Sequence, residues 1–298
     1  MSNILPIPSP NANSDVPTPA GFEERCAALR AGLRAMRRVA VAFSGGVDSA
    51  LVLRVALDEL GRDNVLAVTG RSASLKRSEL EAAEALARSL GAEHVVLDTS
   101  EFDNAAYLAN PTNRCYFCKT TLYEHVRPLL ASRGLTTLIN GTNADDLTDY
   151  RPGLAAADEH GVRSPLAEAG MTKRDVRELA RRLGLDVHDK PASPCLSSRV
   201  PYGESITPEK LRRIEDAEDY LASLGFREVR VRSHADLARI EVPAADLPRL
   251  ADPQIGACVA ARLKALGFTY VTLDLAGFRS GSLNDVIRLN LPERSGSL

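Results

Sequence analysis

The sequence predicts an α/β protein in which helices cover both faces of a parallel sheet, followed by a smaller α+β unit. In the first two thirds of the chain, short β-rich runs alternate with helical runs, a pattern typical of βαβ units with parallel strands. A proline-containing stretch without periodicity then interrupts this pattern. We therefore expect a disordered tail at 1–20, a first domain at 21–190, a loop plus a small α+β domain at 191–280, and a tail at 281–298.

Four strands are expected in the first domain, at 38–43, 64–69, 94–97 and 136–140. Helices separate them, and capping residues mark where these helices begin. The helix at 76–90 has Ser72 or Ser74 placed to cap it. Thr172 and Asp175 have the spacing of a capping box and predict another helix after the fourth strand.

The second part begins with a stretch at 189–207 that contains three prolines. A structureless stretch of that length inside a compact domain is usually functional. Thr207 followed by Pro208 is a strong helix start, and the helix should run to about 224. The elements expected after it are strands at 228–233 and 239–242, a helix at 255–266 and a strand at 270–275.

The composition excludes several classes of protein. The 298 residues are 44% hydrophobic and 26% charged, with a net charge of −2, so there is no basic footprint for nucleic acid. No apolar run approaches the roughly 20 residues of a membrane span. The proline-rich first 20 residues lack the features of a signal peptide. Five cysteines, an odd number, do not suggest a disulfide framework, and we expect a cytoplasmic protein without membrane or nucleic-acid partners.

A glycine-containing loop, Ser44-Gly45-Gly46-Val47-Asp48-Ser49, follows the first expected strand and opens a helix. Glycines let backbone N–H groups approach phosphate oxygens, and a helix N-terminus adds partial positive charge. A tight turn with a capping serine is the plainer interpretation of two glycines alone. The spacing differs from both the Walker and the dinucleotide-binding patterns.

This loop resembles the SGGxDS signature of the PP-loop ATP pyrophosphatases, which have an adenine nucleotide alpha hydrolase-like fold. The resemblance implies that Ser44, Gly45, Gly46 and Ser49 hold the pyrophosphate of ATP while the α-phosphorus is attacked, with Asp48 as the catalytic, Mg²⁺-linked acid. It also places the stretch at 141–146 beside the nucleotide. The expected nucleotide contacts there are Gly141, Thr142 and Asn143, whereas a capped helix start explains Asp145 and Asp146 nearly as well.

Three cysteines suggest sulfur chemistry. Cys195 lies in the long loop, which should leave its thiol accessible. Cys115 and Cys118 are three apart at an apparent helix start, so both sulfurs face one side. Such a pair serves zinc, thiol–disulfide exchange or iron–sulfur ligation; a zinc site would want four ligands, and three cysteines suffice for a [4Fe–4S] cluster with one open iron. Cys26 and Cys258 fit helical apolar patterns and are expected to be structural.

Taken together, the motifs resemble the LarE family of ATP-dependent sulfur transferases in nickel-pincer nucleotide biosynthesis, over about 21–274. The resemblance implies the substrate pyridinium-3,5-biscarboxylic acid mononucleotide, whose carboxylates would be adenylated by MgATP and converted to thiocarboxylates, and it suggests a homo-oligomer. The matching stretches are SGGVDS at 44–49, NRCYFCK at 113–119, GTNADD at 141–146, PASPCLSSRVPYGE at 191–204 and RVRSH…LARIEV at 230–242.

Members of this family supply sulfur in two ways. One subtype sacrifices a single loop cysteine, which becomes dehydroalanine, and Cys195 matches that position. The other uses three cysteines to hold a [4Fe–4S] cluster whose open iron carries a sulfide, and Cys115 and Cys118 match the pair that marks this subtype. The resemblance therefore favours a cluster on Cys115, Cys118 and Cys195, with sacrifice of Cys195 as the alternative.

The resemblance also implies a set of substrate-binding residues. Arg230 and Arg232 are two apart on an expected strand and share a face; guanidinium groups suit phosphate. A solvated sheet face or a helix surface charge is the plainer interpretation of such residues. The positions that match the family's substrate or AMP pocket are Ser198, Arg199, Glu218, Arg230, Arg232 and Glu241. Ala235 departs from the pattern, because a glycine is expected in that turn.

Other functions stay open from the sequence alone. A PP-loop enzyme that thiolates a tRNA base should have a basic surface, which the net charge of −2 disfavours. Amide synthesis gives no reason for the three cysteines. A nucleotide sensor or iron–sulfur scaffold without catalysis would need no intact phosphate loop. Sulfur transfer to an adenylated carboxylate is the function that accounts for both the loop and the cysteines.

Overall fold

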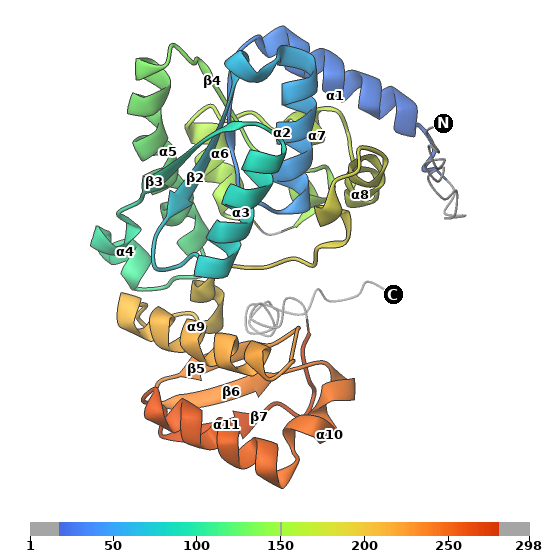
Figure 1. The fold of residues 1–298 in the computed structure, drawn as a ribbon. Coiled ribbons are helices and arrows are strands. Elements are labelled where there is room, and N and C mark those ends of the chain that lie inside the picture. Colours follow the sequence, from blue (N-terminus) through green and yellow to red (C-terminus); the bar gives the residue numbers. More distant parts are fainter. Residues whose placement is uncertain (1–17, 150, 280–298) are drawn as a thin grey trace, which may run out of the picture.

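The first sheet lies between two apolar layers because residues along each strand alternate between its faces. Val39 and Val41 pack into one layer and Ala40 into the other. The computed structural model describes residues 18–149 and 151–279. Its four parallel strands have the order β3-β2-β1-β4 and are β1 (Val39–Ala42), β2 (Val65–Arg71), β3 (Glu93–Asp98) and β4 (Thr137–Ile139) (Figure 1).

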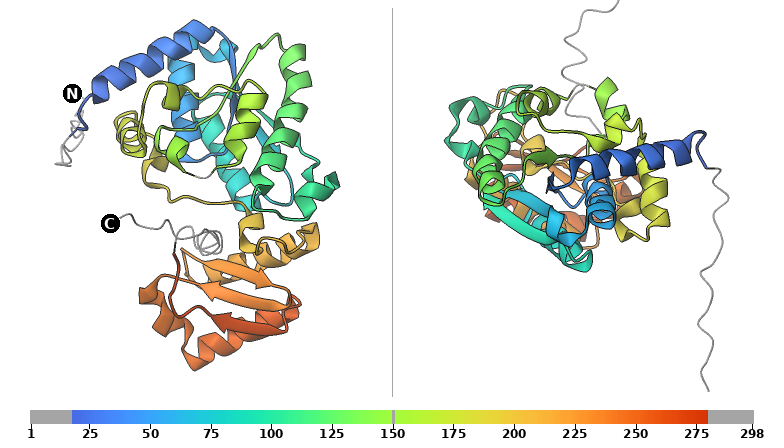
Figure 2. Two further views of the ribbon diagram at one scale, coloured as in Figure 1. Left: turned by 180° about the vertical axis from the view of Figure 1, so that it is seen from behind. Right: turned by 90° about the horizontal axis from the view of Figure 1, so that it is seen from above.

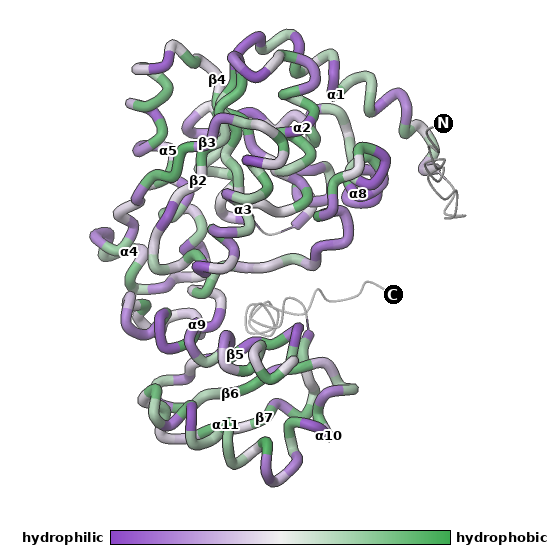
Figure 3. Tube along the Cα trace, in the orientation of Figure 1, coloured by the Kyte–Doolittle hydropathy of each residue, from purple (hydrophilic) through white to green (hydrophobic). Residues whose placement is uncertain are grey.

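Helices cover both faces of this sheet, as the sequence predicts. One core layer gathers residues of α1, α2, α3, α7 and α8, and the other gathers residues of α5 and α6. Figure 3 shows α8 as mostly hydrophilic, in keeping with a helix that buries only one side. The helices are α1 (Phe22–Met36), α2 (Val47–Leu60), α3 (Arg77–Ser89), α4 (Ala105–Leu108), α5 (Arg114–Ser132), α6 (Gly153–Glu159), α7 (Pro165–Glu168) and α8 (Lys173–Arg182).

A second, three-stranded sheet follows, with a separate apolar core. Strands β5 and β6 are antiparallel, whereas β6 and β7 are parallel. Helix α9 lies between the two sheets in views from front and behind (Figures 1 and 2). The elements are α9 (Pro208–Ser223), β5 (Arg230–His234), β6 (Leu237–Glu241), α10 (Leu247–Leu250), α11 (Pro253–Ala265) and β7 (Tyr270–Leu273).

The predicted fold class is confirmed, and so are two helix starts. Thr172 and Asp175 form the capping box of α8, and Thr207 caps α9 with Pro208 at its first position. The strand expected at 239–242 begins two residues earlier, because Ala235 adopts a left-handed φ of 52° and permits a tight turn after β5. The boundary at 190 stays a prediction. Residues 1–17 and 281–298 of the expected tails lie outside the described residues.

The expected cap of α3 is wrong. Lys76 is the N-cap residue and makes no side-chain cap, while Ser72 and Ser74 donate hydrogen bonds to buried Glu101 instead. The carboxylate of Glu215, on α9, accepts a hydrogen bond from the Arg77 amide at 2.6 Å. The first turn of α3 is therefore satisfied by the second part of the molecule.

Among the described residues, no helix has both the length and the apolar character needed to cross a membrane.

Candidate functional site

The phosphate loop, defined as residues 44–49, connects the end of β1 to the start of α2. Ser44 and Ser49 are joined by their hydroxyls at 3.1 Å, and the Ser49 hydroxyl also accepts a hydrogen bond from the Ser44 amide at 3.2 Å. Gly45 has a φ of 70°, and an added Cβ would lie 2.9 Å from the Cβ of Ala83. Glycine at this position is required both by conformation and by space.

Strand β4 ends beside this loop. The chain crosses from β3 to β4 on the far side of β1, so the carboxyl ends of β1 and β4 meet at the topological switch point where ligands bind in such folds. A Cβ on Gly141 would lie 2.6 Å from the Ser49 nitrogen. Only glycine lets the segment at 141–146 approach the phosphate loop so closely.

Asp48 lies in the first turn of α2 between two donors. Its Oδ2 atom accepts from Nζ of Lys173 at 2.5 Å, and its Oδ1 atom from Nδ2 of Asn143 at 3.1 Å. Asn143 is buried and its side-chain oxygen also accepts from the amides of Asp145 and Asp146. The acid is thus fixed by groups from the loop after β4 and from α8, at the edge of the phosphate loop.

A cavity of about 520 Å³ opens at this point. One wall consists of the phosphate loop and the residues after β4, and another wall carries Cys115 and Lys119 of α5. The predicted site residues on its surface are Ser44, Asp48, Ser49, Cys115, Gly141 and Thr142. The structure therefore brings the nucleotide motif and one cysteine of the predicted pair to the same cavity.

The three predicted cysteines share one electrostatic neighbourhood. Burial raises the pKa of the Cys118 thiol to about 12, and Glu101, Cys195 and Cys115 contribute in the same direction. Burial also raises the pKa of Cys115, again with a contribution from Cys195. As whole residues, Cys115 and Cys195 are nonetheless exposed to solvent. The pKa values of Cys115 and Cys118 are thus raised in part by the other cysteines, which places the three residues near one another.

An iron–sulfur cluster is held by thiolates, and the chemistry of this donor set fits one. Cys115 and Cys118 lie on α5, and Cys195 lies in a loop whose Pro194 lines the same cavity. In the described part of the chain, no three His, Cys, Asp or Glu side chains are gathered closely enough to hold a metal ion. The cysteines fit a cluster in kind and in neighbourhood, without forming a closed ligand group.

Arg199 is fully buried and paired with Glu218. Its Nε atom donates to Oε1 of Glu218 at 2.9 Å, and Nη1 donates to the carbonyls of Pro194 and Cys195 at 2.7 and 3.1 Å. Glu218 also contacts the Lys76 ammonium. Burial alone would raise the pKa of Glu218, but Arg199 and Lys76 outweigh it and hold the pKa below its usual value. This pair supports the loop that carries Cys195.

Arg232, like Arg199, is held by a buried glutamate and by a backbone carbonyl of the loop. It makes two hydrogen bonds of 3.0 Å to Glu241 and donates to the Ser198 carbonyl at 2.6 Å. Arg230 is half-buried, donates to the carbonyls of its neighbour Val229 and of Ala192, and has no carboxylate partner among the described residues. None of the six predicted substrate residues lines the cavity of 520 Å³. The residues of this second group are Ser198, Arg199, Glu218, Arg230, Arg232 and Glu241.

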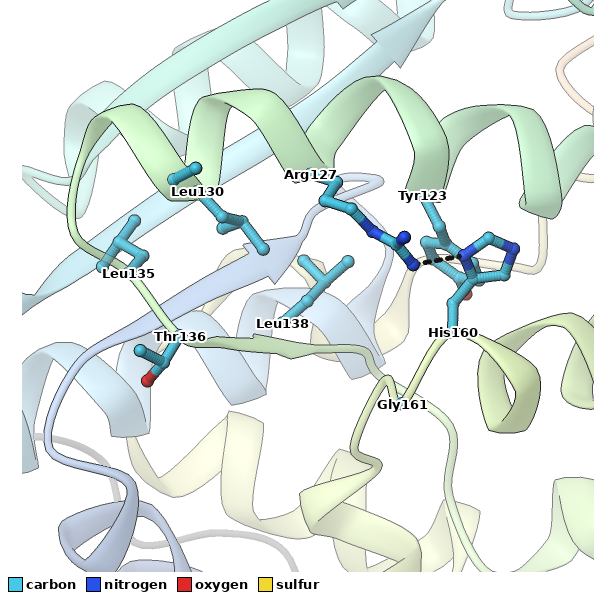
Figure 4. A pocket seen from close by; sticks show the side chains of 9 residues that line it. Tyr123, Arg127, Leu130, Leu135, Thr136, Leu138, His160 and Gly161 are labelled. Carbon is cyan, nitrogen blue, oxygen red and sulfur yellow. Dashed lines mark hydrogen bonds between the residues drawn. The ribbon is translucent and has the colours of Figure 1, made fainter.

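A smaller cavity of about 270 Å³ lies between α5, β4 and α6 (Figure 4). Leucines line much of it, and Nη2 of Arg127 donates to Nδ1 of His160 at 3.4 Å across one end. Tyr123 borders both cavities. The sequence analysis assigned no function to these residues, and none of the predicted site residues lines this smaller cavity.

Two lysines in the site were not predicted. Lys173 stands inside the capping-box motif and looked like a helix-start residue, although its side chain reaches Asp48. Lys119 follows Cys118 directly and lines the main cavity; burial alone would lower its pKa, but Tyr123 and the nearby thiols raise it. Each lysine lies beside a predicted motif, but only the fold shows which way its side chain points.

Comparison with known proteins agrees with this geometry. The NAD synthase family matches residues 23–127, which include the phosphate loop. An uncharacterized protein of Synechocystis sp. is 49% identical over 267 residues, covering 89% of this chain and 99% of that protein. Pyridinium-3,5-bisthiocarboxylic acid mononucleotide synthase of Lactiplantibacillus plantarum is 46% identical over 263 residues, covering 88% of this chain and 94% of the synthase. These two similarities extend over both sheets.

Proposed function

The chain belongs to the LarE family of ATP-dependent sulfur transferases, and on that basis we propose that it converts pyridinium-3,5-biscarboxylic acid mononucleotide to its thiocarboxylic and bisthiocarboxylic forms. The observation that carries this proposal is that the phosphate loop and Cys115 line the same cavity. A nucleotide and a sulfur donor can meet there on one substrate carboxylate.

In the first step, the substrate carboxylate attacks the α-phosphorus of MgATP, and pyrophosphate leaves. Amides of Gly45 and Gly46 and hydroxyls of Ser44 and Ser49 bind the departing phosphates, at a helix N-terminus that favours anions. Asp48 would hold Mg²⁺, and its carboxylate would then exchange its contact with Lys173 for the metal ion. Gly141, Thr142 and Asn143 contact the nucleotide. The product is an acyl-adenylate, whose AMP is a good leaving group.

In the second step, a sulfur nucleophile attacks the acyl carbon and AMP leaves. Cys115, Cys118 and Cys195 would hold a [4Fe–4S] cluster, which would supply this sulfur at the oxidation level of sulfide. Lys119, on the same cavity wall as Cys115, balances negative charge near the thiolates and the departing phosphate. The cavity keeps the acyl-adenylate between the two walls until sulfur has been transferred.

Sacrifice of Cys195 is the alternative source of sulfur. Its thiolate would displace AMP to form a thioester, and β-elimination would then release the thiocarboxylate and leave dehydroalanine at position 195. The exposed side chain of Cys195 supports this route, whereas the shared neighbourhood of three thiols supports the cluster.

The substrate phosphate binds at Arg230, which is the arginine of the second group without a carboxylate partner among the described residues. Ser198, Arg199 and Arg232 shape this subsite through the loop that carries Cys195, and Glu218 and Glu241 hold the two arginines in place. Binding there would leave the pyridinium carboxylates free to reach the main cavity.

One experiment tests the reaction. The protein is incubated with MgATP and either the pyridinium dicarboxylate nucleotide or tRNA, and AMP is measured. We expect release of AMP with the nucleotide and not with tRNA. Release of AMP that tRNA stimulates and the nucleotide does not would contradict the proposal.

A second experiment separates the two sulfur sources. Iron and acid-labile sulfide are measured after anaerobic purification of the wild-type protein and the Cys118→Ala variant. About four iron atoms per chain, lost in the variant, support the cluster. Iron-free protein after anaerobic reconstitution, together with a mass loss of one H₂S at position 195 after turnover, supports sacrifice of Cys195.

A further inference from the structure

Asn110 is a buried residue with an unusual backbone. It adopts a left-handed φ of 51°, a conformation that asparagine accepts more readily than other residues with a side chain, and its side chain is inaccessible to solvent. Its Nδ2 group donates to the carbonyls of Pro201 at 2.7 Å and Glu204 at 3.1 Å, and its Oδ1 atom accepts from Arg114 at 2.5 Å. One side chain therefore joins the start of α5 to a loop about 90 residues further along.

Arg114 continues this connection. The same Nη1 atom that contacts Asn110 also donates to the carbonyl of Ser197 at 2.9 Å. Arg114 is almost fully buried and forms no ion pair with a carboxylate of the described residues. It directly precedes Cys115, and Ser197 is two residues after Cys195. A single guanidinium group thus links the backbones that carry two of the three cysteines.

Further contacts hold the cysteine loop, which we define as residues 194–204. The hydroxyls of buried Tyr107 and Ser197 lie 2.8 Å apart, and the amide of Leu196 donates to the carbonyl of Ser74 at 2.9 Å. The amide of Gly203 donates to the carbonyl of Asn110 at 2.8 Å. The backbone on both sides of position 195 is therefore fixed, although the Cys195 side chain is exposed.

We propose that Asn110 and Arg114 are positioning residues that hold the cysteine loop against α5 and thereby set where the Cys195 thiol stands relative to Cys115. The role that we give this anchor rests on the proposed function: it keeps the sulfur-bearing groups on one side of the cavity. The side chains of the anchor bind backbone carbonyls of the cysteine loop, so the Cys195 side chain can still rotate, while Arg114 also interacts with the Cys115 thiol. Neither residue contacts the nucleotide wall of the cavity.

The first test measures hydrogen exchange of the peptide at 194–206 in the metal-free protein. Asn110→Gly tolerates the left-handed backbone but removes the side-chain amide, and Arg114→Met removes the guanidinium while keeping bulk. We expect exchange in this peptide to become about tenfold faster in each variant, because several hydrogen bonds of the anchor are lost. Arg127→Met, an exposed arginine of the same helix, is the matched control and should leave exchange unchanged.

The second test asks whether the anchor positions a thiol or only stabilises the fold. In a Cys118→Ser, Cys258→Ser background, where Cys115 and Cys195 are the exposed thiols, dibromobimane fluoresces once it bridges the two, and monobromobimane reports single alkylation. We expect bridging from Cys195 to α5 to fall about tenfold in Asn110→Gly and Arg114→Met, while single alkylation stays within twofold. General unfolding would accelerate both reactions. Unchanged exchange and unchanged bridging in both variants, or no bridging in the parent protein, would overturn the proposal.

The same variants separate this inference from the proposed function. ATP–pyrophosphate exchange driven by the carboxylate substrate needs no sulfur and should stay within twofold, while sulfur transfer falls about tenfold. If the parent protein catalyses neither reaction but exchange and bridging respond as expected, the proposed function fails and the anchor stands.

Discussion

The phosphate loop and the cysteine loop lie on the same cavity but are built in opposite ways. The phosphate loop owes its shape to neighbours in sequence: Ser44 and Ser49 contact each other five residues apart, and Gly45 makes the turn. The cysteine loop is held from far away, by Asn110 and Arg114 more than 80 residues earlier. Local geometry makes the first, and tertiary packing makes the second.

This difference determines how each loop responds to change. A substitution in the phosphate loop should act on nucleotide chemistry at once, because its groups face the ligand. A substitution that weakens the cysteine loop can lie in α5 or α9 and act through buried hydrogen bonds. Four comparisons between variants test this contrast, in order of decreasing expected effect.

Asp48→Asn should have the largest effect. Loss of the carboxylate removes the proposed Mg²⁺ ligand, and we expect AMP formation to fall about a thousandfold, equivalent to about 4 kcal/mol in the barrier. The melting temperature should change little, because Asp48 is partly exposed. Asp58→Asn, on the outer part of the same helix, is the control. Full activity of Asp48→Asn would refute the assignment of this loop.

Glu218→Gln tests the support of the cysteine loop. Removing one partner of a buried ion pair should lower the free energy of unfolding by about 3 kcal/mol at neutral pH. Because the pKa of Glu218 is lowered from 4.5 in the folded protein, its contribution is present above about pH 4.5 and is lost as the pH falls through the folded-state value. Denaturant titrations should therefore show the gap between the two proteins narrowing in acid.

The exposed Glu209→Gln variant of the same helix is the control for this titration. An equal loss of stability in both variants would mean that burial of the Arg199–Glu218 pair does not explain the effect of Glu218→Gln. A gap that stays constant down to pH 3 would contradict the lowered pKa of Glu218.

Gly45→Ala and Gly46→Ala form a matched pair in the phosphate loop. The first forces alanine into a left-handed conformation and against Ala83, so we expect a loss of about 2 kcal/mol in stability together with weaker ATP binding. At Gly46 an added Cβ meets only the Ser44 hydroxyl at 3.4 Å. Calorimetry should show a clearly smaller loss there; equal losses would remove the local explanation of the loop.

Ala235→Gly should change the free energy of unfolding least, and it should stabilise the protein where the other variants weaken stability or activity. Ala235 adopts φ 52° in the turn after β5, where its amide lies 3.1 Å from a Glu204 oxygen. Glycine relieves the strain, partly offset by its entropy in the unfolded chain, and should stabilise the protein by about 1 kcal/mol. A lower melting temperature in Ala235→Gly would show that this turn needs its side chain.

The sequence predicted what local pattern determines. The fold class, the capping box at Thr172 and the helix start at Thr207 are confirmed because each depends on residues close in sequence. The cap of α3 was wrong, since its actual partner, Glu215, comes from α9. In the site, the motifs located residues that line the cavity. The spacing of residues along the sequence did not predict that Lys173 contacts Asp48 or that Arg199 forms a buried ion pair with Glu218.

The contact between Glu215 and the start of α3 also affects the order in which the chain can fold during synthesis. Domains fold as the chain emerges from the ribosome, N-terminal part first. Residue 77 emerges long before residue 215. The first turn of α3 therefore lacks the hydrogen bond between the Arg77 amide and Glu215 until α9 has been synthesised. A fragment that stops at residue 190 would carry an α3 that is less stable by about 1 kcal/mol. A helix of the first domain is thus completed only after much of the second part of the chain has been synthesised.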